Sequence, residues 1–164
     1  MIPLEDVIAL RRDLHRHPEP SGQEFRTAER VEAFLRESGL SPRRVAGTGV
    51  LADLGEGNDR LLFRADLDAL EIQEETGLSF ASTVPGMMHA CGHDVHTAIL
   101  AGLAGRLAAD PPAGGAYRFC FQPSEETLPG GAEAVIREGA LEGVAAAVAL
   151  HVYPQVRVGQ VSLR

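Results

Sequence analysis

The sequence has few cysteines, a shortage of basic residues and no long apolar run. Its two cysteines, Cys91 and Cys120, are too few for a disulfide framework. It has 15 basic against 23 acidic residues and a formal charge of -8, which argues against nucleic acid and anionic membranes as partners, because both require a basic surface. No apolar run is long enough to cross a bilayer, and the charged segment 1–14 is unlike a signal peptide. Together these absences predict a cytoplasmic protein.

The chain does contain enough apolar sequence for one globular domain. It has 164 residues, of which 45% are hydrophobic. Apolar residues recur at helical spacing in 4–14 and 25–35, and 98–107 is apolar on nearly all sides, which predicts two amphipathic helices and one buried helix. The segment Ser21-Gly22-Gln23-Glu24 has the pattern of a capping box for the second helix, and Gly39 is expected to close that helix.

Strand-like segments alternate with these helices. Residues 131–138 are expected to form a further helix. The expected strands are 50–54, 61–65, 117–121, 144–150 and 156–163, and 144–150 is apolar throughout, which predicts a buried strand. Helices alternating with buried strands indicate a three-layer α/β/α domain.

Ionisable side chains follow several of the expected strands. In open α/β sheets the ligand site lies outside the carboxyl ends of the strands, so these side chains are expected to share one edge of the sheet. Cys91, His93 and Asp94 are expected in a loop just before the buried helix. The side chains that follow the strands are Asp66, Asp68, Glu125, Glu126 and His151.

The segment His89-Ala90-Cys91-Gly92-His93-Asp94-Val95-His96 has the composition of a metal site. Thiolate, imidazole and carboxylate groups are the ligands that hold zinc and similar ions. Cys91 and His93 can turn toward one centre because Gly92 between them lets the backbone bend. The alternative is a polar loop with surface histidines and a buried thiol.

The adjacent carboxylates Glu125 and Glu126 form a second signal. Two neighbouring carboxylates repel each other unless a cation lies nearby, so a metal ion could bind one and leave the other free as a base. The alternative is a solvated acidic turn. His151 alone would be read as a core histidine, but with the other clusters present it is read as a ligand. Asp66 and Asp68 could bind metal, hold a ligand histidine by its other nitrogen, or cap strand ends.

Three other groups are interpreted as structural. His15 and His17 lie near the N-terminus and are expected to be structural or surface groups. Cys120 alternates with Phe119 and Phe121 along its strand, which indicates inert core filling.

Taken together, these residues resemble a known family, the aminoacylase and carboxypeptidase-like dinuclear metallohydrolases. The resemblance is to the amidohydrolase branch, which includes hippurate hydrolase, N-acyl-amino-acid hydrolases and auxin-conjugate hydrolases. It implies hydrolysis of the amide bond of N-acyl amino acids or small peptide-like substrates. The motifs that carry it are His15-Arg16-His17-Pro18-Glu19, Arg64-Ala65-Asp66-Leu67-Asp68-Ala69-Leu70, Met88-His89-Ala90-Cys91-Gly92-His93-Asp94, Gln122-Pro123-Ser124-Glu125-Glu126 and Leu150-His151-Val152.

The resemblance also implies roles for individual residues. Two divalent metal ions (zinc, manganese, cobalt or nickel) would be held by the bridging thiolate of Cys91 together with the other ligands His93, Glu126 and His151. Glu125 would be the general base, and Asp66 would lie close to the metals as a second catalytic residue.

Two departures from the family pattern are visible. Glu71 stands where the family usually has proline. Family members also continue into a lid and dimerisation domain and then return to the catalytic domain with a further metal-binding histidine. Residues 1–164 are therefore expected to be the N-terminal part of an incomplete catalytic domain and a poor catalyst alone, with self-association or a complementing C-terminal segment as partners.

Other functions compete with this reading. A hydrolase could use Cys91 as a nucleophile without metal, but it would give no role to the glutamate pair. The chain could also be an inactive metal-binding remnant, or one half of a split enzyme. A zinc nucleobase deaminase is excluded because its H-x-E and P-C-x-x-C segments are missing.

Overall fold

Two amphipathic helices begin the fold, close to their predicted positions. In the computed structural model, which describes residues 2–162, α1 spans Leu4–Arg16 and α2 spans Phe25–Glu37. Gly39 follows α2 with φ +85°, a conformation that glycine adopts without strain. This confirms the predicted end of the second helix.

The predicted capping box at Ser21–Glu24 is wrong. No side chain of the N-cap residue caps α2. The carboxylate of Glu19 instead accepts hydrogen bonds from the backbone N–H groups of Arg26 and Thr27, at 3.1 and 2.7 Å. The serine hydroxyl is not available, because it donates to Asp68 Oδ2 at 2.7 Å. Distant contacts therefore replace the local pattern.

The centre of the fold is a five-stranded mixed sheet with the order β1-β2-β4-β3-β5. β1 and β2 pair antiparallel, β2 and β4 pair antiparallel, and β3 is parallel to both β4 and β5. The predicted strands 50–54 and 61–65 are confirmed, but β4 lies between them. The strands span Arg43–Val45, Gly49–Leu54, Arg60–Asp66, Tyr117–Gln122 and Val144–Ala149.

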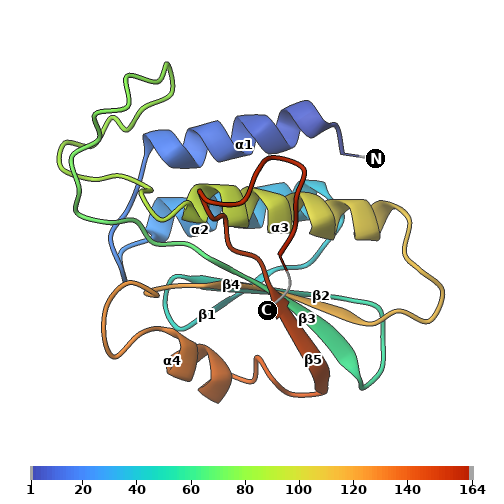
Figure 1. The fold of residues 1–164 in the computed structure, drawn as a ribbon. Coiled ribbons are helices and arrows are strands. Elements are labelled where there is room, and N and C mark those ends of the chain that lie inside the picture. The colour runs from blue at the N-terminus through green and yellow to red at the C-terminus, as the bar shows by residue number, and fades with distance from the viewer. Residues whose placement is uncertain (1, 163–164) are drawn as a thin grey trace.

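Helices cover both faces of this sheet. α1, α2 and α3 (His93–Ala109) lie on one face, and the short α4 (Ala132–Arg137) lies on the other (Figure 1). The larger core lies under the three helices and includes the fully buried Phe119 and Phe121. Cys120 points to the smaller core beneath α4, which confirms it as core filling. The predicted three-layer α/β/α class is therefore confirmed.

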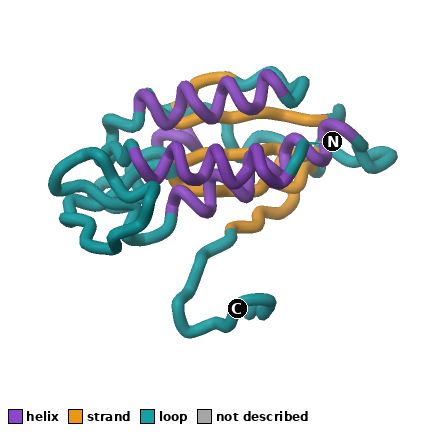
Figure 2. Tube along the Cα trace, turned by 90° about the horizontal axis from the view of Figure 1, so that it is seen from above, coloured by secondary structure: helices purple, strands orange, loops and turns teal. Residues whose placement is uncertain are grey.

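The last strand differs from its prediction. β5 is largely exposed rather than buried, because it lies at the sheet edge and pairs only with β3; Val148, for example, is 42% exposed. The chain then leaves the sheet as a loop (Figure 2). The strand expected at 156–163 is wrong over 156–162, which contains no strand, and residue 163 lies outside the described residues.

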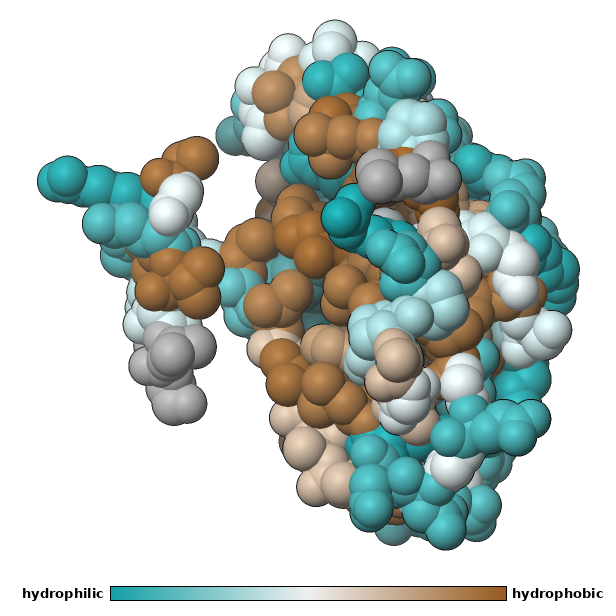
Figure 3. All heavy atoms as spheres, turned by 90° about the vertical axis from the view of Figure 1, so that its right-hand side faces the viewer, coloured by the Kyte–Doolittle hydropathy of each residue, from teal (hydrophilic) through white to brown (hydrophobic). Residues whose placement is uncertain are grey.

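Apolar side chains remain exposed on this side of the molecule. Brown side chains gather beside the projecting arm of the chain in Figure 3. Leu150, Tyr153, Val158 and Val161 are among the exposed apolar residues of the segment after β5. Among residues 2–162, no helix has both the length and the apolar composition that a membrane span requires.

Candidate metal centre

The predicted polar residues do meet at one edge of the sheet. The strands β3, β4 and β5 are parallel, so their carboxyl ends lie together, and α3 begins at the same edge. Three groups of side chains there could each hold a metal ion, and His93 belongs to all of them. The groups are Cys91 with His93 and His151, His93 with Glu125 and Glu126, and Asp66 with His93 and His96.

The start of α3 sets the direction of two of these side chains. α3 begins at His93, earlier than predicted, so His93 and Asp94 lie in its first turn and not in a loop. Gly92 precedes the helix with φ +86°, and a Cβ added there would lie 2.4 Å from Val152 Cγ2. Glycine is therefore required at this bend, on both conformational and steric grounds.

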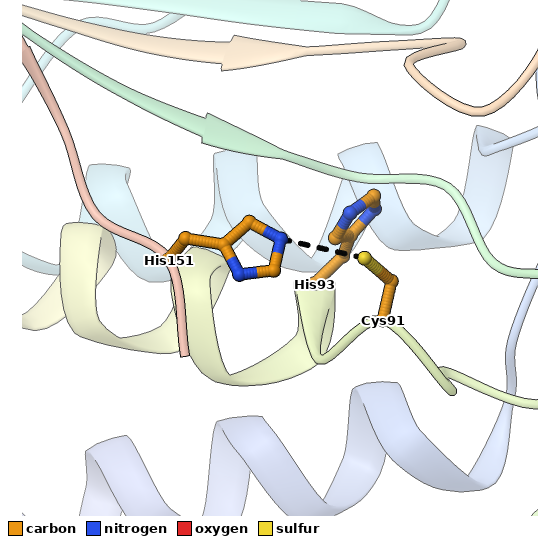
Figure 4. Close-up of side chains that lie close together, drawn as sticks. All are labelled: Cys91, His93 and His151. Carbon is orange, nitrogen blue, oxygen red and sulfur yellow. Dashed lines mark hydrogen bonds between the residues drawn. The ribbon is translucent and has the colours of Figure 1, made fainter. Parts of the chain in front are cut away.

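Cys91, His93 and His151 form one of these groups (Figure 4). Their potential ligand atoms all lie within 4.8 Å of one another. Cys91 Sγ lies 3.4 Å from His151 Nε2. His151 Nδ1 lies 2.7 Å from the carbonyl oxygen of Val152 and so donates to it, which leaves Nε2 as the nitrogen with a free lone pair. This nitrogen faces the thiol.

His93 is held by one ring nitrogen and is unpartnered at the other. Its Nδ1 donates to the backbone carbonyl of Asp68 at 2.9 Å, with the Asp68 carboxylate 3.4 Å away. Its Nε2 is buried and has no hydrogen-bond partner. That atom lies 3.8 Å from the Asp66 carboxylate, 3.9 Å from Glu125 and 3.6 Å from Glu126. A buried imidazole nitrogen among three carboxylates has the surroundings of a metal ligand.

Asp68 connects two of the predicted ligands. Besides facing His93, its carboxylate accepts from the backbone N–H of Glu126 at 2.9 Å and from the hydroxyl of Ser21 at 2.7 Å. Although burial acts to raise the pKa of Asp68, these hydrogen bonds hold that pKa well below its usual range. The sequence left several roles open for Asp68. The structure supports the one in which Asp68 holds a histidine by its other nitrogen.

Asp66 has a different environment. It forms an ion pair with Arg64 through Oδ1 at 2.5 Å. Burial raises the pKa of Asp66, and the nearby carboxylates of Glu125 and Asp68 act in the same direction. A cation bound beside Asp66 would act in the opposite direction and lower its pKa.

The turn that carries the glutamate pair is supported by a residue that the sequence reading misassigned. Glu24 is fully buried and accepts from the backbone N–H of Ser124 at 2.7 Å and from the hydroxyl of Thr48 at 2.5 Å. Ser124 has φ +50°, an uncommon conformation for a residue with a side chain. Glu24 thus fixes the strained residue directly before Glu125, a contact that links residues 100 positions apart.

The electrostatics of the site disfavour a free thiolate. Burial raises the pKa of Cys91 to about 12, and the carboxylates of Glu126, Glu125 and Asp66 add to the effect. Reactive cysteine nucleophiles have lowered pKa values and electropositive surroundings. The cysteine-nucleophile alternative therefore lacks support from the structure.

The same surroundings fit a divalent cation. His93 Nε2 and Glu126 Oε1 are buried atoms without hydrogen-bond partners, and both face this cluster of carboxylates. Thiolate, imidazole and carboxylate together form a donor set suited to zinc and similar ions. Cations would supply the missing partners and offset the negative charge.

His96 belongs to this site but was not assigned by the sequence reading. It is 2% exposed, and its Nε2 accepts from the backbone N–H of Val152 at 2.9 Å. Burial lowers the pKa of His96 to about 4, and the neighbouring His93 and His151 lower it further. Only its position in the histidine-rich segment could have indicated it.

The two histidines near the N-terminus agree with a structural role. His15 is buried and lies 2.9 Å from Asp94 and 3.2 Å from Glu74, which joins α1 to the start of α3. His17 lies 2.8 Å from the backbone carbonyl of Asp13.

Comparison with known proteins identifies the family of this chain. Residues 62–164 match Peptidase family M20/M25/M40, which is more than half of the chain. The chain therefore belongs to this family, as the resemblance implied.

Individual relatives match nearly the whole chain but are much longer. A Rhodococcus jostii protein whose name proposes a glutamate–cysteine ligase is 49% identical over 96% of this chain and 20% of its own length. An N-acyl-L-amino acid amidohydrolase of Geobacillus stearothermophilus is 45% identical over 96% of this chain and 44% of its own length. The crystal structure of YxeP from Bacillus subtilis, a dinuclear metal-binding peptidase, matches with TM-score 0.88 and 44% identity over 94% of this chain and 45% of that chain. The chain thus spans less than half the length of each of these relatives.

Proposed function

We propose that this chain takes part in metal-dependent hydrolysis of the amide bond of N-acyl amino acids. The proposed ligands of two divalent ions, zinc, manganese, cobalt or nickel, are Cys91, His93, Glu126 and His151. The observation that carries the proposal is the buried, unpartnered Nε2 of His93, which is common to all three potential metal groups. The names of the Geobacillus and Bacillus relatives support the amide substrate and the two ions.

The two glutamates are suited to different tasks. The side chain of Glu126 is 20% exposed and its backbone N–H is fixed by Asp68, as expected for a ligand. The side chain of Glu125 is 41% exposed, so it can reach a substrate, and we assign it as the general base. When bound, the metal ions would lower the pKa of a water molecule and polarise the amide carbonyl. Glu125 would take the proton of the attacking water and deliver it to the leaving amine.

Asp66 is proposed to support this chemistry from the β3 strand end. Its carboxylate lies 3.8 Å from His93 Nε2 and is paired with Arg64. In this position it can neutralise positive charge at the site and orient the ligands without moving a proton itself.

We further propose that residues 1–164 form the N-terminal part of a catalytic domain. The support is the share of the relatives' length that the chain spans, together with the uncovered apolar edge at β5. The partner of that edge is a complementing C-terminal segment or a second copy of the chain. Alone, the chain is proposed to be a poor catalyst, because catalysis requires a closed and preorganised site.

The decisive experiment measures metal binding and activity separately. Zinc, manganese, cobalt and nickel are titrated into the purified chain by calorimetry, and hydrolysis of several N-acyl amino acids is assayed with each ion. We expect measurable binding in the wild type, much weaker binding in Cys91→Ala, and unchanged binding in Cys120→Ala, which removes the thiol of the smaller core.

The assay of the base uses a matched pair of variants. Glu125→Gln keeps the size of the side chain and should retain metal but lose whatever turnover the chain shows. Glu56→Gln, an exposed change in the turn after β2, should have no effect. Absence of metal binding in the wild type, or hydrolysis that persists after chelation, would contradict the proposal.

A further inference from the structure

We propose that His96 is a positioning residue, which orients the metal ligand His151 through the backbone of Val152 and does not bind metal itself. The inference rests on the proposed function, because it takes His151 to be a ligand. It concerns a residue that neither the motifs nor the family match assigns to a role.

The hydrogen bonding of His96 fixes which ring nitrogen carries its proton. A backbone N–H can only donate, so the 2.9 Å contact from Val152 makes His96 Nε2 an acceptor. The neutral ring then carries its hydrogen on Nδ1, a buried atom that makes no hydrogen bond and lies 4.0 Å from Asp66 Oδ2. With one lone pair used and the other nitrogen protonated, His96 has none left for a metal. This argues against the group of Asp66, His93 and His96 as a metal site.

The same contact continues to His151. The N–H of Val152 is bound by His96, and its carbonyl oxygen accepts from His151 Nδ1 at 2.7 Å. His151 Nε2 therefore points away from the Val152 carbonyl, and it lies 3.4 Å from Cys91 Sγ. The ring of His96 also packs edge-on against the ring of His151, with centroids 4.6 Å apart. His96 thus supports the predicted ligand by two contacts.

The side chain of Val152 provides an independent anchor. Its Cγ2 occupies the space where a Cβ of residue 92 would lie, so Gly92 leaves room for it. The segment after β5 is thereby seated against Gly92, the residue directly before α3.

Such an anchor is needed because of where His151 lies. β5 ends at Ala149, and this edge strand is paired on one side only. Beyond it the chain has no strand pairing within the described residues to hold the histidine in place. Groups that orient a metal-binding histidine typically contribute about 10–100-fold to metal affinity.

The test compares two substitutions of His96 that differ in one property. His96→Gln retains an acceptor oxygen near the position of Nε2, whereas His96→Leu has a similar volume and no acceptor. Hydrogen exchange of the Val152 amide is measured in the metal-free chain, and zinc affinity is measured by calorimetry. His17→Gln, a histidine of the loop after α1, is the control.

We expect His96→Leu to accelerate exchange of the Val152 amide and to lower zinc affinity about 10–100-fold. His96→Gln and His17→Gln should stay close to the wild type in both measurements. In a His151→Ala background, His96→Leu should cause no further loss of zinc affinity, because its effect passes through His151. This last comparison also separates a positioning role from general destabilisation.

Three results would overturn the inference. Wild-type zinc affinity in His96→Leu would show that no positioning is needed. If His96→Gln and His96→Leu lost the same zinc affinity while exchange of the Val152 amide stayed unchanged, His96 would be a metal ligand. If His96→Leu lowered zinc affinity further in the His151→Ala background, His96 would act independently of His151. If the wild type bound no zinc, the proposed function would fail, and the Val152 amide would still report on the hydrogen bond.

Discussion

Replacing Asp68 by asparagine would test the connection between the two sides of the site. The carboxylate accepts from Ser21 Oγ at 2.7 Å and from the Glu126 N–H at 2.9 Å, and it faces the protonated Nδ1 of His93 at 3.4 Å. Asn keeps one oxygen for the first two donors, but it directs its NH2 group at the N–H of His93. Two donors would then face each other inside a buried site.

The size of the effect follows from these contacts. A hydrogen bond to a charged group contributes about 1.5–3 kcal/mol, and Asp68→Asn weakens two such bonds and loses an attraction to His93. We expect the free energy of unfolding of the metal-free chain to fall by about 2–4 kcal/mol at neutral pH. Zinc affinity should fall about 10–100-fold, because His93 and Glu126 both lose their support.

The pH dependence provides the sharpest check. The pKa of Asp68 is lowered from its usual 3.8, so its stabilising effect is present above that value and is lost as the pH falls through the lower folded pKa. The difference between wild type and Asp68→Asn in urea unfolding should therefore persist from pH 8 to 5, with an increase toward pH 5 because Asp68 also raises the pKa of His93, and it should shrink below about pH 4. The control is Asp110→Asn, an exposed aspartate after α3. This reasoning would be refuted if Asp68→Asn lowered the free energy of unfolding no more than the control does, or if its difference from the wild type persisted at low pH.

Three further substitutions address other parts of the site. Glu24→Ala should lower the free energy of unfolding by about 1–3 kcal/mol, because it leaves the buried N–H of Ser124 without an acceptor; urea denaturation measures this. Cys91→Ser should flatten the rise of zinc affinity with pH, which in the wild type includes about tenfold per pH unit from release of a thiol proton whose pKa burial raises to about 12. His15→Gln should be most destabilising below about pH 6: the hydrogen bond to Asp94 raises the pKa of His15 above 6.5, so the stabilisation is complete below that value and is lost as the pH rises through the folded pKa.

Each of these predictions has a contrary result, and the first also has a control variant. Glu29→Ala, an exposed change on α2, should leave the free energy of unfolding unchanged. If it lowered this free energy as much as Glu24→Ala does, the proposed support of Ser124 by Glu24 would be wrong. A zinc affinity with the same pH slope in Cys91→Ser would mean that the thiol is not a ligand. For His15→Gln, a destabilisation that grows with rising pH would show that the histidine acts in its neutral form.

The elements of the fold were predictable where local pattern and tertiary contacts agree. The helices at 4–14 and 25–35 were found because their buried residues recur at helical spacing. β5 was misread because a purely apolar run looks the same whether covered or at a sheet edge. The order of the strands in the sheet could not be predicted either, because no local pattern indicates that β4 lies between β2 and β3.

The site followed the same division. Cys91 and His93 could be chosen as candidates from ligand chemistry, and Glu125, Glu126 and His151 from their positions after strands. Glu24 could not, because its partner Ser124 is 100 positions away and its local surroundings matched a capping motif. His96 was hidden for a similar reason: its role depends on the backbone of a segment 56 residues further along the chain.

The position of β4 has a consequence for how the chain reaches this structure. β4 is the fourth strand in sequence but the central one in the sheet, with β2 and β3 on either side. As the chain leaves the ribosome, β2 and β3 are complete about 50 residues before the strand that must separate them, and each has an open edge in the meantime. Pairing of these two early strands with each other is therefore a competing, non-native hairpin. Parallel contacts over long sequence separations form slowly, so insertion of β4 is the expected rate-limiting step of folding and the period of greatest exposure to aggregation.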